Sequence, residues 1–496
     1  MGLDELVESL KLPRPPWQHQ AVEWELSKDR NERLLLWQMG VGKTTTATVW
    51  LRIKYRQRGK IDRTLVLAPL ATLSGWLADF QRNAPATVAS QAVIVAGSGK
   101  KKMPGKKRAE LILAGAQRIL LTNYETLTMP EPLAALKTFP PVHLVLDEIH
   151  RLKNPSSKRL KGLLSFSDKA ETRLGLTGTL VLNSFMDVWA PIRVIDSGKR
   201  FGTNFYSQFR DKYFLDLNAG MRGKSHYFPD WQPHAGLEQV IAEKLNSLAS
   251  RKTKEECLDL PPRVVAHVEV GLSAEQQRLY DEMNDDLVSS VERGEATASN
   301  ALVKLLRMRQ IICGFLPIES TDEDPQPARI ERFKENQRLD ALSDIMEDVC
   351  GQSKLVVWST FRANYPALRK LCEDLKLEYA EYHGETKDKD GNKRKFIEDP
   401  KCRVLLANPQ AGGTGVDGLQ AVASYCVYFD RSHSAEHYWQ SRDRLHRGGA
   451  EVHAKITEIH IVAKDTIDQE ILGALERKEN AAEAILSRIK AKLQSR

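Results

Sequence analysis

The chain has 496 residues, a length that corresponds to two to four domains. Hydrophobic residues make up 42% and charged residues 28%, the balance of a globular protein with a sizeable core. No apolar run approaches about 18 residues and no signal-peptide pattern is present, so we expect neither membrane insertion nor secretion. The six scattered cysteines form no Cys-x-x-Cys pair, which argues against a zinc or iron–sulfur site and fits a reducing compartment.

Basic residues exceed acidic ones, which gives a formal net charge of +8 at pH 7. This excess is compatible with a polyanionic partner such as nucleic acid, but an ordinary basic protein has the same balance. Charge alone therefore leaves both interpretations open.

In chain order, the first informative stretch is 34–45, an apolar run followed by a glycine turn, a lysine and two threonines. The run predicts a buried parallel strand, and Gly40 and Gly42 allow a tight turn that approaches a ligand closely. Strand, Gly-x-Gly-Lys-Thr and helix together predict a phosphate-binding loop. Lys43 would reach the terminal phosphates, and the Thr44 hydroxyl would bind Mg²⁺.

This loop departs from the strict pattern, because Trp37 stands where the pattern has glycine. The alternative interpretation is a glycine-rich turn with an incidental lysine. The motifs further along the chain decide between the two.

Further strand-like runs alternate with helical stretches and fall into two series. Between the series, aromatic residues and helical patterns dominate as far as Ile312, and an acidic, proline-containing linker follows at 319–327. Strands that alternate with helices predict an α/β fold with parallel, helix-covered sheets. The first series comprises 64–69, 118–124, 142–148 and 173–179, and the second 354–360, 403–408, 425–430 and 457–462.

The run 142–148 ends in two carboxylates, Asp147 and Glu148, at the edge of the sheet where ligands of such folds bind. Asp147 would hold Mg²⁺ and Glu148 would orient and deprotonate the attacking water of a phosphoryl transfer. An acidic pair that only caps the next helix is the alternative. Thr177 and Thr179 bring hydroxyl groups to the same edge, where they can sense the γ-phosphate, although such a turn is a weak signal.

Arg444 and Arg447 lie three residues apart, so we expect them to share a helix face. Two convergent guanidinium groups match a triphosphate, and an arginine finger accelerates hydrolysis by about 10³–10⁵. A solvated basic face is the alternative. Because these arginines lie in the second series and Lys43 lies in the first, we hypothesise a site that is completed only when the two halves close.

Taken together, the motifs resemble the Swi/Snf-type ATPases of helicase superfamily 2, over roughly 13–472. Trp17-Gln18 is similar to the adenine-reading glutamine motif of that family. Met39-Gly-Val-Gly-Lys-Thr44 is close to its Met-Gly-Leu-Gly-Lys-Thr loop, and Asp147-Glu-Ile-His150 to its Asp-Glu-Ala-His box. The segment after the second strand, with Trp76 and Phe80, resembles one that contacts a nucleic-acid backbone.

The resemblance implies a fold, a domain order and a set of site residues. The fold is two RecA-like parallel-sheet lobes with a helical insertion between them. We expect lobe 1 over 1–190, the insertion and linker over 191–330, lobe 2 over 331–472 and a C-terminal helix over 473–496. The implied ATP-binding residues are Gln18, Gly40, Gly42, Lys43, Thr44, Thr45 and Gln440; the metal ligands are Thr44 and Asp147; the catalytic residues are Lys43, Asp147, Glu148, Arg444 and Arg447; the residues that couple ATP to nucleic acid are Pro69, Thr177, Thr179, Gly413, Thr414 and Gly415.

The chain also departs from the family pattern. Trp37-Gln38 replaces the usual Asp-Glu, Asp417-Gly418 replaces the usual Asn-Leu, and 430–433 lacks the usual Trp-Asn-Pro. The catalytic groups are retained, and most changes fall where ATP use is coupled to DNA. Hydrolysis is therefore better supported than efficient translocation.

We accordingly expect a monomeric motor that uses ATP and Mg²⁺ and translocates on DNA, with duplex preferred and RNA as an alternative. The resemblance to a bare motor favours the cytoplasm of a bacterium or of a phage-infected cell, with no membrane partner. Two rivals remain: a strand-separating DNA or RNA helicase, and a DNA-binding clamp or loader that ATP only switches.

Overall fold

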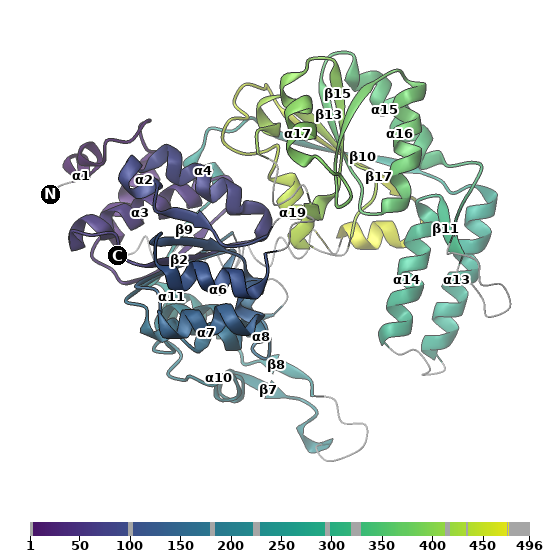
Figure 1. The fold of residues 1–496 in the computed structure, drawn as a ribbon. Coiled ribbons are helices and arrows are strands. Elements are labelled where there is room, and N and C mark those ends of the chain that lie inside the picture. The colour runs from purple at the N-terminus through teal and green to yellow at the C-terminus, as the bar shows by residue number, and fades with distance from the viewer. Residues whose placement is uncertain are drawn as a thin grey trace. The chain divides into compact units, whose positions relative to one another are not determined.

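The structure is a computed structural model that describes residues 3–97, 103–178, 184–221, 229–292, 298–318, 329–411, 417–432, 435–473 and 475. The chain divides into two compact units after Leu258, and each is treated by itself (Figure 1). Within these residues no helix combines the length and apolarity needed to cross a bilayer.

The first unit is built on a seven-stranded sheet, in the order β3-β4-β2-β5-β6-β1-β9, whose neighbouring strands are all parallel. Strands β5, β6 and β1 are adjacent, so their carboxyl ends bring Asp147, Thr177 and Trp37 to one edge. The strands are β1 (Glu32–Trp37), β2 (Thr64–Leu67), β3 (Ala92–Ile94), β4 (Ile119–Thr122), β5 (His143–Asp147), β6 (Thr172–Thr177) and β9 (Ala249–Lys252).

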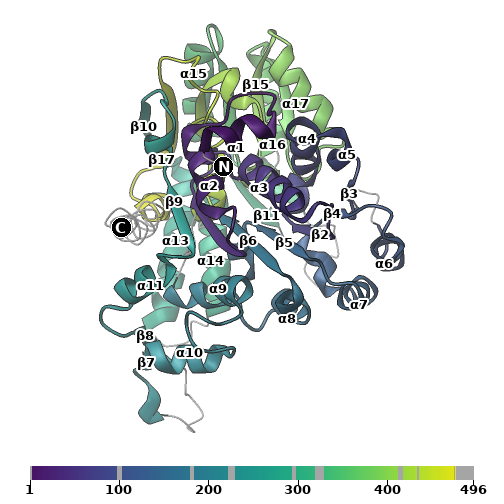
Figure 2. The same cartoon turned by 90° about the vertical axis from the view of Figure 1, so that its left-hand side faces the viewer.

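Helices cover both faces of this sheet (Figures 1 and 2). Leu34 and Leu36 face one apolar core while Leu35 and Trp37 face the other, which explains why β1 is a continuous apolar run. Helices α2–α4 pack on the second core, and α6–α9 and α11 on the first. The helices are α1 (Leu3–Leu10), α2 (Gln18–Ser27), α3 (Lys43–Arg58), α4 (Leu73–Asn83), α5 (Ala86–Ala89), α6 (Gly105–Ala114), α7 (Pro130–Thr138), α8 (Lys158–Leu164), α9 (Trp189–Asp196), α10 (Tyr206–Tyr213), α11 (Leu237–Leu245) and α12 (Lys254–Cys257).

The second unit contains a six-stranded parallel sheet in the order β10-β17-β16-β13-β15-β14. The prediction of an α/β protein with two parallel-sheet halves is therefore confirmed. Its strands are β10 (Arg263–Val270), β13 (Lys354–Trp358), β14 (Glu378–Tyr382), β15 (Cys402–Ala407), β16 (Ala423–Tyr428) and β17 (Ile456–Ala463). Its helices are α13 (Ala274–Glu292), α14 (Ala298–Ile312), α15 (Gln337–Cys350), α16 (Tyr365–Asp374), α17 (Lys389–Glu398) and α19 (Ala435–Arg442).

The segment between the two sheets does not form a separate insertion. Helices α9–α11, the antiparallel hairpin of β7 (Phe214–Asp216) and β8 (Trp231–Pro233), and strand β9 belong to the first unit. Helices α13 and α14 and the hairpin of β11 (Phe315–Ile318) and β12 (Arg329–Arg332) belong to the second.

The structure divides the chain at Leu258, which lies inside the segment 191–330 that the sequence assigns to the insertion and linker. Strand β9 pairs with β1 although its sequence, Ala-Ser-Arg-Lys, carries no apolar pattern that would mark it as a strand. Residues 476–496 lie outside the described part, so the C-terminal helix expected over 473–496 stays a prediction.

Candidate functional site

The glycine loop after β1 is braced by helix α2. Gly42 has a φ of 85°, and a Cβ there would lie 2.5 Å from the Gln20 amide nitrogen and 2.9 Å from the Trp17 ring. Both the left-handed backbone and the lack of space therefore require glycine. The Gln20 amide donates to the Gly42 carbonyl at 3.2 Å, and His19 Nε2 donates to the Val41 carbonyl at 2.9 Å.

The residues beside the glutamine motif make the contacts with the loop. The side chain on the loop belongs to buried Gln20, whereas Gln18 is exposed at the first residue of α2. The contact of Gln18 with adenine stays a prediction. Sequence reasoning missed His19 and Gln20, whose only local signal was their place directly after the motif.

Lys43 opens helix α3 and turns back onto the end of β1. Its ammonium group donates to the carbonyl oxygens of Trp37 and Gln38 at 2.9 and 3.2 Å, and the side chain is buried. Thr44 is half-buried one residue further along α3. The Thr45 hydroxyl donates to Asp79 at 2.7 Å, so its side chain braces α4, and its contact with a nucleotide stays a prediction.

Asp147 and Glu148 follow β5 as predicted. Asp147 accepts a hydrogen bond from the Trp76 indole at 2.9 Å. Burial and the neighbouring Glu148 raise the pKa of Asp147 to about 6, although Trp76 and Lys43 oppose this shift. Glu148 has a φ of 50°, a left-handed conformation that costs about 1–3 kcal/mol and is found mainly at functional sites.

The donor set at this edge fits Mg²⁺. In the described part of the chain, no three acidic, histidine or cysteine side chains gather into a group that could hold a metal by themselves. Mg²⁺ is bound through one or two protein oxygens together with water and substrate phosphates. The buried carboxylate of Asp147 and the hydroxyl of Thr44 supply oxygens of this kind.

A buried polar chain joins β5 to β6. His150 Nδ1 lies 3.3 Å from Glu148 Oε2 and 2.9 Å from the hydroxyl of Thr177, which is the last residue of β6. The residue predicted to activate water is thus linked through one imidazole to the residue predicted to sense the γ-phosphate. Sequence reasoning gave a role to each of the two ends but none to His150, the fourth residue of the motif. Thr179 lies outside the described residues.

The segment after β2 buries its two aromatic residues. The side chains of Trp76 and Phe80 are 1% and 0% exposed and belong to the core, so a contact of this segment with nucleic acid, which stays a prediction, would have to come from its other residues. Pro69 is also buried, and the exposed side chain beside it is that of Leu70. Helix α4 buries this face because its apolar residues pack against the sheet.

In the second unit, two arginines converge on one carboxylate. Arg444 Nη1 and Arg447 Nη1 donate to the same oxygen of Asp417, at 2.8 and 2.6 Å. The side chain of Asp417 is 61% exposed. Its partial burial raises its pKa, but Arg447 and Arg444 outweigh this effect and lower the pKa to about 2. Asp417 therefore carries a full negative charge at neutral pH and holds both predicted finger residues.

The convergence of these arginines does not come from a shared helix face. Helix α19 ends at Arg442, and Arg444 and Arg447 lie in the turns that follow it. The expectation that the two arginines share a helix face was therefore wrong. Gln440 is a buried residue of α19. The predicted coupling residues Gly413, Thr414 and Gly415 lie outside the described residues.

Two other departures from the family pattern have structural roles. The Trp37 indole donates to the Ser250 hydroxyl at 2.8 Å and the Gln38 amide oxygen accepts from the Lys254 N–H at 3.1 Å, which attaches β1 to β9 and α12. In the second unit, buried Asp430 accepts from Ser359 Oγ at 2.6 Å and from Asn364 Nδ2 at 3.0 Å, and it also binds Thr360. These contacts tie the end of β16 to the end of β13.

Comparisons with known proteins fit this geometry. Putative protein p41 of Acyrthosiphon pisum secondary endosymbiont phage 1 is 25% identical and covers 97% of this chain and 99% of its own. An uncharacterized ATP-dependent helicase of Mycoplasma genitalium is 24% identical over 95% of this chain and 42% of its own length. Nuclear protein STH1/NPS1 of Saccharomyces cerevisiae is 25% identical over 92% of this chain and 33% of its own.

The chain thus spans less than half the length of the last two relatives. Among solved structures, the Sulfolobus solfataricus SWI2/SNF2 ATPase core in complex with dsDNA aligns with a TM-score of 0.42 and 20% identity, over 97% of this chain and 95% of its own. The sequence profile of the SNF2-related domain matches residues 17–315, more than half of the chain. The resemblance drawn from the motifs is therefore confirmed, and the chain belongs to the SNF2-related domain family.

Proposed function

We propose that this chain is an ATP-hydrolysing motor that acts on duplex DNA. One observation carries the proposal: the phosphate loop, the Asp147-Glu148 pair and Thr177 follow the three adjacent strands β1, β5 and β6. Ligands of parallel α/β sheets bind at this edge, and these residue types are those that phosphoryl transfer requires. Membership in the SNF2-related family supports the same activity.

The first unit would bind the triphosphate of ATP at the start of α3. Lys43 would exchange the carbonyl oxygens of Trp37 and Gln38 for phosphate oxygens, and the N–H groups of the loop would receive the rest of the charge. Thr44 and Asp147 would hold Mg²⁺, which neutralises charge on the phosphate oxygens when bound. Glu148 would accept a proton from the attacking water, and His150 would keep that carboxylate oriented toward Thr177.

The arginines of the second unit would stabilise charge that develops on the transferred phosphoryl group. In the structure both guanidinium groups bind Asp417, so a phosphate must replace this carboxylate before they can act. We propose that the exchange is the step that DNA binding promotes. Phosphate contacts with the DNA backbone carry affinity and no sequence information, so the binding would be sequence-independent and salt-sensitive.

The test is an ATPase assay with no nucleic acid, single-stranded DNA, duplex DNA or RNA, together with displacement of a triplex strand and unwinding of a forked duplex. We expect duplex DNA to stimulate turnover most, with triplex displacement and poor fork unwinding. Fork unwinding without triplex displacement would instead establish a strand-separating helicase. Nucleotide binding without turnover on any nucleic acid would establish an ATP-switched clamp.

A further inference from the structure

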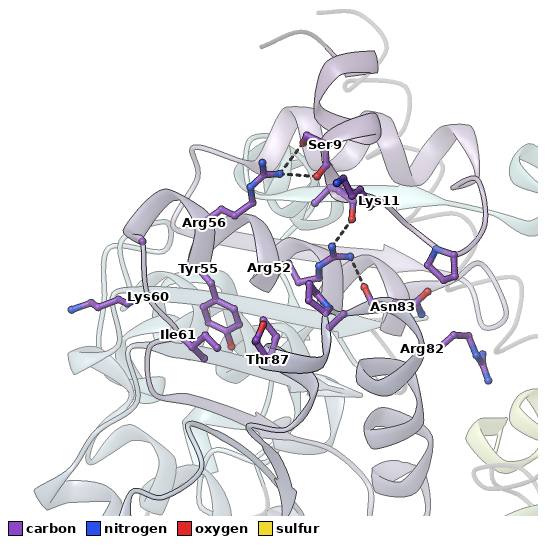
Figure 3. Close-up of a pocket in the computed structure, with 16 residues that line it drawn as sticks. Ser9, Lys11, Arg52, Tyr55, Arg56, Lys60, Ile61, Arg82, Asn83 and Thr87 are labelled. Atoms are coloured by element: carbon purple, nitrogen blue, oxygen red, sulfur yellow. Dashed lines mark hydrogen bonds between the residues drawn. The ribbon is translucent and has the colours of Figure 1, made fainter.

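The first unit contains a second cavity, remote from the phosphate loop and lined by basic residues. It has a volume of about 770 Å³, within the range of about 300–1,000 Å³ that small-molecule sites occupy. Its walls come from the end of α1, the second half of α3 and the segment from the end of α4 into α5 (Figure 3). Helix α3 begins at Lys43 and reaches the cavity at Arg52, about 14 Å further along its axis.

Five cationic side chains line this cavity, and its lining, all of it within the described residues, contains no aspartate or glutamate. Among the described residues, Lys60 lies 3.6 Å from the carboxylate of Asp62, and Arg82 interacts electrostatically with buried Asp79. The carbonyl groups at the end of α3 carry a partial negative charge of about half a unit, which repels an anion. The five positive side chains outweigh this charge. The cations are Lys11, Arg52, Arg56, Lys60 and Arg82.

Arg52 forms the base of this cluster. Its side chain is buried, and its guanidinium donates to the backbone carbonyls of Asn83 and Leu10, which are neutral acceptors (Figure 3). Burial and the neighbouring Arg56 both lower the pKa of Arg52, and no carboxylate within the described residues forms an ion pair with it. A buried positive charge without an acidic partner is costly, and an anionic ligand would remove that cost.

The exposed cations are available to such a ligand. Arg56 donates to the backbone and hydroxyl oxygens of Ser9, while the side chains of Lys11 and Arg82 make no hydrogen bond or ion pair within the described part of the chain. Lys60 and Arg82 lie at opposite ends of the cavity (Figure 3). Arginine forks match the geometry of phosphate oxygens, and long basic side chains can turn toward a bound group.

The remaining walls are apolar, which favours a ligand with more than a charge. Pro13, Ile61, Pro85 and Val88 line the cavity beside the cations. A DNA backbone needs a row of cations on an open surface, whereas this cavity offers cations at its base and ends and apolar surface between them. A flat, apolar body that carries phosphate groups would use both.

We propose that this cavity is a second site of the first unit and that it binds a small phosphorylated ligand of the nucleoside phosphate class. The site is separate from the phosphate loop, so the inference does not depend on the ATPase proposal. Because one continuous helix joins the two sites, occupation of the cavity would restrain α3, whose first residue is Lys43.

The test is calorimetric titration of the full chain carrying Lys43→Ala, which weakens the phosphate loop, with ADP and separately with inorganic pyrophosphate. We expect one ADP site that survives Lys43→Ala. A second chain would also carry Lys11→Glu and Arg82→Glu, and we expect at least a tenfold loss of ADP affinity there, because two attractive charges become repulsive. The matched control reverses two other exposed lysines of the same unit, Lys137→Glu and Lys161→Glu, and should leave binding unchanged.

Weaker binding of pyrophosphate than of ADP would show that the apolar walls contribute. Both reversed residues of the cavity are exposed, so the variant that carries them should melt at the same temperature as the parent chain. An unchanged melting temperature would show that folding is retained. Equal ADP binding with and without the reversals would overturn the proposal. Loss of ADP binding in the control with Lys137→Glu and Lys161→Glu would also overturn it, since the effect would then come from net charge alone.

Discussion

The two units hold their phosphate-directed cations in different ways. Lys43 in the first unit donates to two carbonyl oxygens and interacts electrostatically with Asp147, whereas Arg444 and Arg447 in the second unit both donate to one oxygen of Asp417. Bonds from a cation to a neutral carbonyl are already charge-assisted, and an exposed ion pair adds only about 0.2–1 kcal/mol of attraction. In the second unit a carboxylate competes directly with phosphate for the two arginines, so this unit is where we expect regulation.

The largest effect should come from Lys43→Ala, which removes the cation of the first unit. We expect turnover to be abolished, since no other residue of the loop supplies this charge. Duplex-stimulated ATP hydrolysis measures it, with circular dichroism as the check on folding. A folded variant that keeps more than about a tenth of the wild-type turnover would show that Lys43 is not the cation that binds the phosphates.

Glu148→Gln should have the next largest effect. The amide keeps the shape of the side chain but cannot accept the proton of water, so we expect a loss of about 10²–10⁴-fold in turnover. Binding of ATP and Mg²⁺ should persist, because Asp147 is unchanged, and filter binding with labelled ATP measures it. Turnover near the wild-type rate would show that the roles of the two carboxylates are wrongly assigned.

Arg447→Ala tests the second unit. The nucleotide loop belongs to the first unit, so ATP affinity should stay within several-fold while stimulation by DNA is lost. Turnover measured across ATP concentrations, with and without duplex, separates the two quantities. A large loss of ATP affinity at an unchanged maximal rate would contradict the assignment of ATP binding to the first unit and of stimulation by DNA to the second.

The smallest effect, and the sharpest test of the comparison, is Asp417→Asn. Asparagine is a neutral acceptor, so both arginines would lose an ion pair that contributes about 0.2–1 kcal/mol at an exposed carboxylate. A difference of about 1 kcal/mol corresponds to a rise of up to about fivefold in turnover without DNA. The control is Asp374→Asn, an exposed aspartate of the same unit with no ion pair in the described structure.

The sign of that change decides between two roles for Asp417. If the carboxylate competes with phosphate, the asparagine variant turns over ATP faster without DNA. If it instead positions the arginines for catalysis, the variant turns over ATP more slowly, and the contrast between the two units is lost. Because the pKa of Asp417 lies at about 2, neither outcome should vary with pH between 6 and 8.

The sequence alone determined the features that depend on neighbouring residues in the chain. A strand, a Gly-x-Gly-Lys-Thr turn and a helix are contiguous, so the phosphate loop could be predicted before any tertiary contact was known. The carboxyl ends of parallel strands meet at one edge, so Asp147 and Thr177 could also be placed near the loop. The two parallel-sheet halves followed from the alternation of strands and helices.

Only the tertiary structure decided the contacts between distant segments. Strand β9 joins the first sheet through backbone pairing that its side chains do not reveal, and Gln20 lies on the loop because α2 packs against α3. Arg444 and Arg447 meet at Asp417, 27 and 30 residues earlier in the chain. The basic cavity brings together the ends of helices that are dispersed between residues 9 and 88. Such contacts depend on how whole elements pack, and no local spacing in the sequence encodes them.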